Sequence, residues 1–144
     1  MTRKMFRLMW ALMAISAVLM STGCAGVKYD AVTIANATSV NKQLDALADK
    51  STTDFSANTT QIQQVKDSLQ AAIAHEKKRG KTNITAYMWT DINKYFNNQF
   101  LATWQKDSKF GQPFVNEIKK RFDEIFKYIT DLENHKAGGP DYQK

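Results

Sequence analysis

Few residues of this sequence have the type and spacing that catalysis or metal binding requires. His75 and His135 are the only histidines and fall on separate predicted helices, whereas a zinc site needs three or four ligands. Asp123 and Glu124 are adjacent, and neighbours on a helix point about 100° apart, so a catalytic carboxylate pair is not expected. Cys24 is the only cysteine, which excludes an intrachain disulfide and a cysteine-based metal cluster. No phosphate-binding loop, nucleophile elbow or metalloprotease motif occurs, so we expect a protein that is not an enzyme and uses no metal or cofactor.

Residues 1–23 have the layout of a secretory signal. A strongly apolar, uncharged run at residues 8–20 is followed by three small residues. The run is preceded by a basic head made of Arg3, Lys4 and Arg7. As a helix the apolar run would reach only about 20 Å, against a hydrocarbon core of about 30 Å. We therefore predict a signal that is cleaved before Cys24. The alternatives are ordinary signal cleavage after Ala25, which would leave Cys24 in the discarded peptide, and a signal that is retained as a membrane anchor.

The segment Ser21-Thr22-Gly23-Cys24 resembles the lipobox of bacterial lipoproteins, in which a branched apolar residue and two small residues usually precede the cysteine. The resemblance covers the first 24 residues, and Ser21 departs from the usual pattern. It implies a diacylglycerol thioether on Cys24, cleavage before Cys24, and N-acylation of the new terminus with a chain such as palmitate. Two acyl chains on one cysteine give stable anchoring.

Ala25 bears on the membrane that such an anchor would enter. In enteric lipoproteins an Asp after the lipidated cysteine retains the protein in the inner membrane, so Ala25 resembles an outer-membrane signal. The resemblance therefore implies a lipid-anchored protein of the bacterial cell envelope, in the outer membrane and facing the periplasm.

Much of the basic character of the chain belongs to the signal. Without residues 1–23, 17 basic residues stand against 14 acidic ones, so the net charge falls from +6 to +3 and a nucleic-acid partner is not expected. Two basic clusters remain, at residues 77–81 and 119–121. Either could touch anionic head groups, but a solvated helix end and a solvated helix face are the simpler interpretation.

Apolar residues recur at spacings of three and four through the mature chain, which predicts helices, and no run alternates as a strand would. The last two helices are expected at about residues 84–106 and from Pro113 onward. The first carries Ile84, Tyr87, Met88, Ile92, Tyr95, Phe96, Phe100 and Trp104, and the second carries Val115, Ile118, Phe122, Ile125, Ile129 and Leu132. We expect an all-α fold of three or four helices, the last two forming an aromatic-rich antiparallel hairpin.

Residues 32–78 leave two arrangements open. The stripe of Val40, Leu44 and Leu47 is in helical phase with that of Ile62, Val65, Leu69 and Ile73. One long, coiled-coil-like helix of roughly 70 Å would satisfy this phase. Two helices broken near residues 51–54 fit equally well, because Thr and Asp there are good helix caps. In either case the chain divides into a signal peptide (1–23), a lipidated tether (24–31), a helical domain (32–136) and a flexible tail (137–144).

The tail ends Asp141-Tyr142-Gln143-Lys144. A terminal lysine two residues after a tyrosine resembles the end of the major murein lipoprotein, although Gln143 stands where that family has arginine. The resemblance covers three residues and implies covalent attachment of Lys144 to peptidoglycan. An ordinary disordered terminus is the simpler interpretation.

Two functions fit these observations. The first is a lipid-anchored envelope protein with a non-enzymatic helical interaction or scaffold role and an envelope protein as its partner. The alternative is a periplasmic binder of an apolar ligand, held between the aromatic helices from Tyr87 to Trp104. Helical spacing of these rings favours a simple core.

Overall fold

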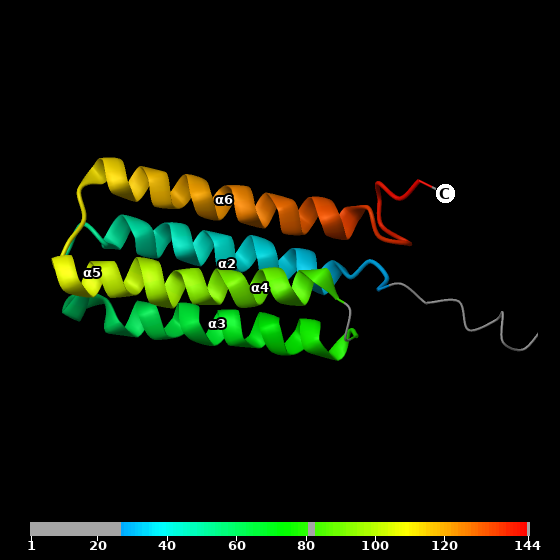
Figure 1. Cartoon of the computed structure of the whole chain (residues 1–144), viewed down its shortest axis with the longest axis horizontal. Coiled ribbons are helices and arrows are strands. Elements are labelled where there is room, and N and C mark those ends of the chain that lie inside the picture. The colour runs from blue at the N-terminus through cyan, green and yellow to red at the C-terminus, as the bar shows by residue number, and fades with distance from the viewer. Residues whose placement is uncertain (1–26, 81–82, 144) are drawn as a thin grey trace, which may run out of the picture.

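Four antiparallel helical rods form the computed structural model, which describes residues 27–80 and 83–143 (Figure 1). The rods are α2 (Ala31–Lys50), α3 (Thr59–Lys78), a composite of α4 (Ile84–Tyr95), η2 (Phe96–Leu101) and α5 (Ala102–Asp107), and α6 (Gln112–Asn134); the short 3-10 turn η1 (Phe55–Asn58) precedes α3. Each rod packs on two others: α2 on α3 and α6, and α4 on α3 and α6. All regular secondary structure in the described residues is helical, which confirms the all-α prediction.

The two ends of this bundle differ in what they carry. At one end, called here the tether end, α2 and α4 begin and α3 and α6 finish (Figure 1). The chain enters the bundle there, and residues 137–143 turn back at the same end. The opposite end, called the far end, holds the α2–α3 and α5–α6 connections. No helix within the described ranges is both long and apolar enough to span a membrane.

The predicted aromatic hairpin is present. The ring centroids of Trp89 and Phe126 are 5.5 Å apart, and those of Tyr95 and Phe122 are 5.7 Å apart, both edge to face. Each pair joins the third rod to α6 and is of the kind that adds about 0.5–1.5 kcal/mol beyond area burial. The buried aromatic residues of these two rods therefore form one continuous core.

The first part of the chain is two helices, so the alternative of one long helix is wrong. The chain leaves helical geometry after Ser51, whose buried carbonyl accepts a hydrogen bond from the Phe110 amide at 2.8 Å. The Phe55 amide in turn donates to the Ser108 carbonyl at 3.2 Å, and Trp104 Nε1 donates to the Thr53 carbonyl at 3.0 Å. These bonds connect the two turns of the far end, and a continuous helix would lose all three.

The third rod contains a π-helical segment, η2, in its middle. The buried residues of the third rod include Trp89, Ile92, Phe96, Phe100 and Trp104, and the last three lie at intervals of four residues. In an α-helix of 3.6 residues per turn, such spacing rotates steadily off one face. A π-turn takes an extra residue into one turn, so it returns Phe100 and Trp104 to the core side.

The start of α4 differs from the predicted apolar face. Ile84 and Tyr87 are 61% and 65% exposed, and Thr85 is fully buried instead. The reason lies at the cap: Asn83 Oδ1 accepts from the Thr85 amide at 3.2 Å, and Thr85 Oγ1 accepts from Lys136 at 2.8 Å. A polar contact therefore sets the rotation of this first turn.

Candidate functional site

At the tether end, every rod places a polar residue in a core position. Thr33 on α2, Glu76 on α3, Thr85 on α4 and Glu133 on α6 extend the four buried stripes, and none is more than 1% exposed. Burying a carboxylate costs several kcal/mol unless cations and hydrogen bonds compensate. The compensation comes from two cations at the same end.

Arg79, the residue directly after α3, is the first of these cations. Its Nη2 lies 2.5 Å from Glu133 Oε1, and its Nη1 lies 3.0 Å from Glu76 Oε2. Its Nε lies 3.4 Å from Asp30 Oδ2, and Nη2 also donates to the carbonyl oxygen of Lys28. The side chain of Arg79 is only 10% exposed. One guanidinium thus binds α3, α6 and the entering chain together.

Lys136, just beyond α6, is the second cation. Its Nζ lies 2.6 Å from Glu133 Oε2 and donates to Thr85 Oγ1 at 2.8 Å. Asn83 completes the set, because its Nδ2 donates to Glu76 Oε2 at 2.5 Å. Both buried carboxylates therefore have charged or polar partners on both oxygens.

Asp30 connects the entering chain to this network. Its Oδ1 accepts from the Val32 amide at 2.8 Å and caps α2, and its Oδ2 lies 2.7 Å from His75 Nε2. Its own amide donates to Glu133 Oε1 at 2.7 Å. We call the set of Asp30, His75, Glu76, Arg79, Glu133 and Lys136 the tether-end cluster.

The charges of this cluster hold two carboxyl groups ionised. Burial acts to raise the pKa of Glu133, but the hydrogen bonds and charges of Arg79 and Lys136 outweigh it, so the pKa lies below its ordinary value of 4.5. Burial also opposes ionisation of Asp30, yet His75, the Val32 amide and Arg79 lower its pKa below 3.8. Since these groups bind one another, the cluster is suited to holding segments together rather than to acting on a substrate.

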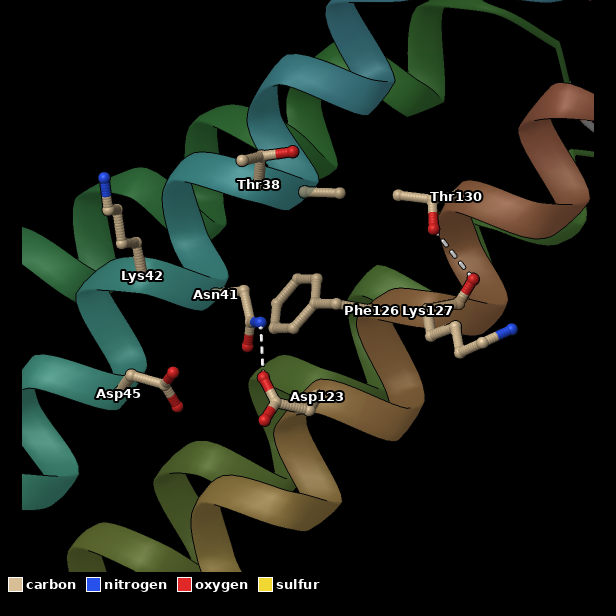
Figure 2. Close-up of a pocket in the computed structure, with 9 residues that line it drawn as sticks. Thr38, Asn41, Lys42, Asp45, Asp123, Phe126, Lys127 and Thr130 are labelled. Atoms are coloured by element: carbon tan, nitrogen blue, oxygen red, sulfur yellow. Dashed lines mark hydrogen bonds between the residues drawn. The ribbon is translucent and has the colours of Figure 1, made fainter. Parts of the chain in front are cut away.

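A groove between α2 and α6, of about 400 Å³, is the second feature of interest (Figure 2). Asn41, Asp45 and Asp123 lie around it with the ring of Phe126 between the helices, while the amine of Lys127 points away. Asn41 Nδ2 donates to Asp123 Oδ1 at 2.7 Å. The groove is open along the side of the bundle.

Two buried acceptor atoms beside this groove have no hydrogen-bond partner within the described chain: Asn41 Oδ1 and Asp45 Oδ1. Burial raises the pKa of Asp45, and the negative charges of Asp123 and Asp49 raise it further, although Lys119 opposes them. These two buried oxygens therefore lack donors, and Asp45 lies close to two other carboxylates.

The structure places the other predicted site residues as follows. Cys24, Ala25 and Lys144 lie outside the described residues. His75 belongs to the tether-end cluster, whereas His135 is exposed and its Nδ1 lies 2.7 Å from the Asp131 carbonyl oxygen. In residues 27–80 and 83–143, no group of three or more metal-binding side chains comes together.

The two predicted basic clusters differ in their surroundings. Lys77 and Lys78 are exposed at the end of α3. On α6, Lys119 lies 3.0 Å from Asp49 and Arg121 lies 3.0 Å from Glu117, so most of that cluster is paired. The tether end therefore holds the less compensated of the two.

The aromatic side chains largely fill the space between their helices. Trp89, Phe96, Phe100, Trp104 and Phe122 are at most 1% exposed. Two pockets remain at the surface beside these helices: one of about 190 Å³ is lined in part by Tyr95, Phe114 and Ile118, and one of about 480 Å³ in part by Tyr95, Glu124 and Ile125. Binding of an apolar ligand between these helices stays a prediction.

Sequence reasoning missed the tether-end cluster, although a signal was available. Glu133 follows Val115, Ile118, Phe122, Phe126 and Ile129 in the same helical phase, and Glu76 follows Ile73 by three residues. A charged residue at the next position of a buried stripe predicts a buried ion pair. The partners of Glu133 are Arg79 and Asp30, which lie 54 and 103 residues away in the sequence, so only the fold identifies them.

Comparison with known proteins adds no relative: no protein-family model, curated protein or solved structure matches the chain. The functional argument therefore rests on the residues and contacts described above.

Proposed function

We propose that this chain is a bacterial lipoprotein, cleaved before Cys24, acylated on that cysteine and held in the outer membrane. In this proposal its four-helix bundle faces the periplasm and serves a non-enzymatic interaction or scaffold role. The observation that carries the proposal is the basic, apolar and small-residue order of residues 1–23 ending at the single cysteine. In this proposal the contacts of Lys28 and Asp30 join the segment after the anchor to the bundle.

The anchor is tested by replacing Cys24 with Ser. We expect Cys24→Ser to abolish metabolic labelling by palmitate and to leave the uncleaved precursor, since the hydroxyl does not replace the thiol in thioether formation. Labelling and the apparent mass on a gel are the measurements. A matched Ser21→Ala change is the control and should be labelled and cleaved. Palmitate labelling of the Cys24→Ser protein would refute the proposal.

For the interaction role, the groove between α2 and α6 is the surface that best suits a partner. Asp45 is partly exposed beside the groove, and burial together with the negative charges of Asp123 and Asp49 raises its pKa. A lysine or arginine side chain from an envelope protein would offset the negative charge of these carboxylates. We therefore propose a partner that presents a basic side chain to this groove.

A photoreactive residue placed at Thr38, which is exposed and lines the groove, tests this contact in intact cells. We expect a discrete crosslinked product from Thr38 that disappears when Asp45→Lys is added, because the new charge repels the partner. The control position is Asn98, exposed on η2, and should give no such product. Identical products from both positions, or a Thr38 product that persists with Asp45→Lys, would place the partner elsewhere.

A further inference from the structure

The connection between anchor and bundle is short, if Cys24 is lipidated as proposed. Three Cα–Cα steps separate Cys24 from Val27, and at about 3.8 Å each they span at most about 11 Å. From Lys28 onward the chain is held by the bundle: Arg79 binds the Lys28 carbonyl, and the Tyr29 amide donates to the Ala137 carbonyl at 3.1 Å. The tether end is therefore confined close to the lipid surface.

The exposed charges at the tether end are mainly positive. Lys28, Lys77 and Lys78 are exposed there. Of the acidic groups nearby, Asp131 lies 2.5 Å from Lys127 and Asp141 is exposed, while those of the tether-end cluster are internally paired. The far end is mixed, with exposed Lys50, Lys106 and Lys109 beside exposed Asp49, Asp54 and Asp107.

Exposed apolar side chains concentrate at the same end. Val32, in the first turn of α2, is 49% exposed, and Ile84, the first residue of α4, is 61% exposed. Tyr87 and Tyr142 are also exposed there, so four of the six large exposed apolar side chains of the described residues lie at this end. Lysines beside aliphatic and tyrosine side chains are the composition of surfaces that enter the interfacial region of a bilayer.

We infer that the tether end of the bundle docks on an anionic lipid bilayer. Lys28, Lys77 and Lys78 face the head-group phosphates, and Val32 and Ile84 enter the interface. The inference rests on the proposed lipid anchor, which supplies proximity, and the surface adds a fixed orientation. The bundle then stands upright, with its far end directed away from the membrane.

The test uses the acylated protein, purified from membranes and reconstituted into vesicles that contain a head-group quencher. One fluorophore is placed at Ala74→Cys near the tether end, and in a second protein at Ala57→Cys in η1 at the far end; both alanines are exposed. The vesicles are phosphatidylcholine alone, or phosphatidylcholine with phosphatidylglycerol. The variants are K28E/K77E/K78E and the matched far-end control K50E/K106E/K109E, which makes the same change in net charge.

In phosphatidylglycerol vesicles we expect several-fold stronger quenching at position 74 than at position 57. Each lysine near an anionic surface strengthens binding by about fivefold. The tether-end triple variant should therefore show a much smaller difference, of the size that the lipid tether alone gives, and the far-end triple variant should keep the full difference. Equal quenching at the two positions, or a difference that is unchanged by K28E/K77E/K78E or by omitting phosphatidylglycerol, would overturn the inference. A purified protein whose mass lacks acyl chains would instead refute the proposed anchor.

Discussion

We expect Arg79→Met to lower the free energy of unfolding by about 3–5 kcal/mol at pH 7, which is the usual cost of removing one partner from a buried ion pair. Methionine keeps much of the side-chain volume but leaves Glu76 and Glu133 without their shared cation. Both carboxylates are at most 1% exposed, so water does not replace the lost partner. Urea unfolding of the chain from Ala25 onward, followed by circular dichroism, measures the change.

Two comparisons separate this expectation from a general effect of losing an arginine. Arg121→Met removes an exposed guanidinium that lies 3.0 Å from Glu117, and it should leave the free energy of unfolding essentially unchanged. Adding Glu133→Gln to Arg79→Met should recover part of the loss, because it removes one buried charge. A double variant less stable than Arg79→Met alone would show that the buried charge is not the cause.

Arg79→Met should also change how the free energy of unfolding depends on pH. In the wild-type protein the folded pKa values of Asp30 and Glu133 lie below their ordinary values of 3.8 and 4.5. Their ionised forms therefore stabilise the fold above those ordinary values, and this stability is lost as the pH falls through the folded pKa values. Without Arg79, burial raises the pKa of Glu133, and protonation relieves the variant. The difference in stability between wild type and variant should shrink between pH 7 and pH 4.

Phe122→Asp should lower the free energy of unfolding by at least about 4 kcal/mol, because truncation of a buried Phe alone costs 3–5 kcal/mol and the carboxylate is also buried. Phe122 is fully buried on α6, and its ring lies 5.7 Å from that of Tyr95 and 6.2 Å from that of Phe100. Since a domain of this size is stable by about 5–15 kcal/mol, this loss removes a large part of its stability and should lower the melting temperature by at least about 10 °C. Thermal unfolding followed by circular dichroism tests this.

Tyr128→Asp is the matched control on the same helix. Tyr128 is 67% exposed, so the new carboxylate stays in water. The melting temperature should change little, within the range of ordinary surface substitutions. If the Phe122→Asp and Tyr128→Asp variants had the same melting temperature, α6 would not bury the face that carries Phe122.

The amino-acid sequence by itself determined the positions and the buried faces of most helices. The spacing of Val115, Ile118, Phe122 and Ile129 predicts the inner face of α6, and all four are buried. The break before α6 follows from local chemistry, since Pro113 is favoured in the first turn of a helix. These features depend on periodicity and on backbone preferences, which are properties of neighbouring residues.

The predicted signal at residues 1–23 and the lipobox resemblance at Cys24 also come from the sequence alone, and both lie outside the described residues. The attachment of Lys144 to peptidoglycan stays a prediction for the same reason. Residues 137–143 turn back at the tether end, with the Asp141 amide donating to the Asn134 carbonyl at 3.1 Å. The length of the bundle therefore does not carry this tail away from the proposed anchor.

Tertiary structure decided the features that depend on distant partners. Residues 32–78 suit one helix or two, and the break at Ser51 exists because Phe110 reaches its carbonyl from across the far end. Glu133 and Glu76 are charged residues at buried positions of their helices. They are stable there because Arg79 lies between them and pairs with both. Periodicity shows which face of a helix is buried, whereas the pairing of buried polar groups depends on which helices become neighbours.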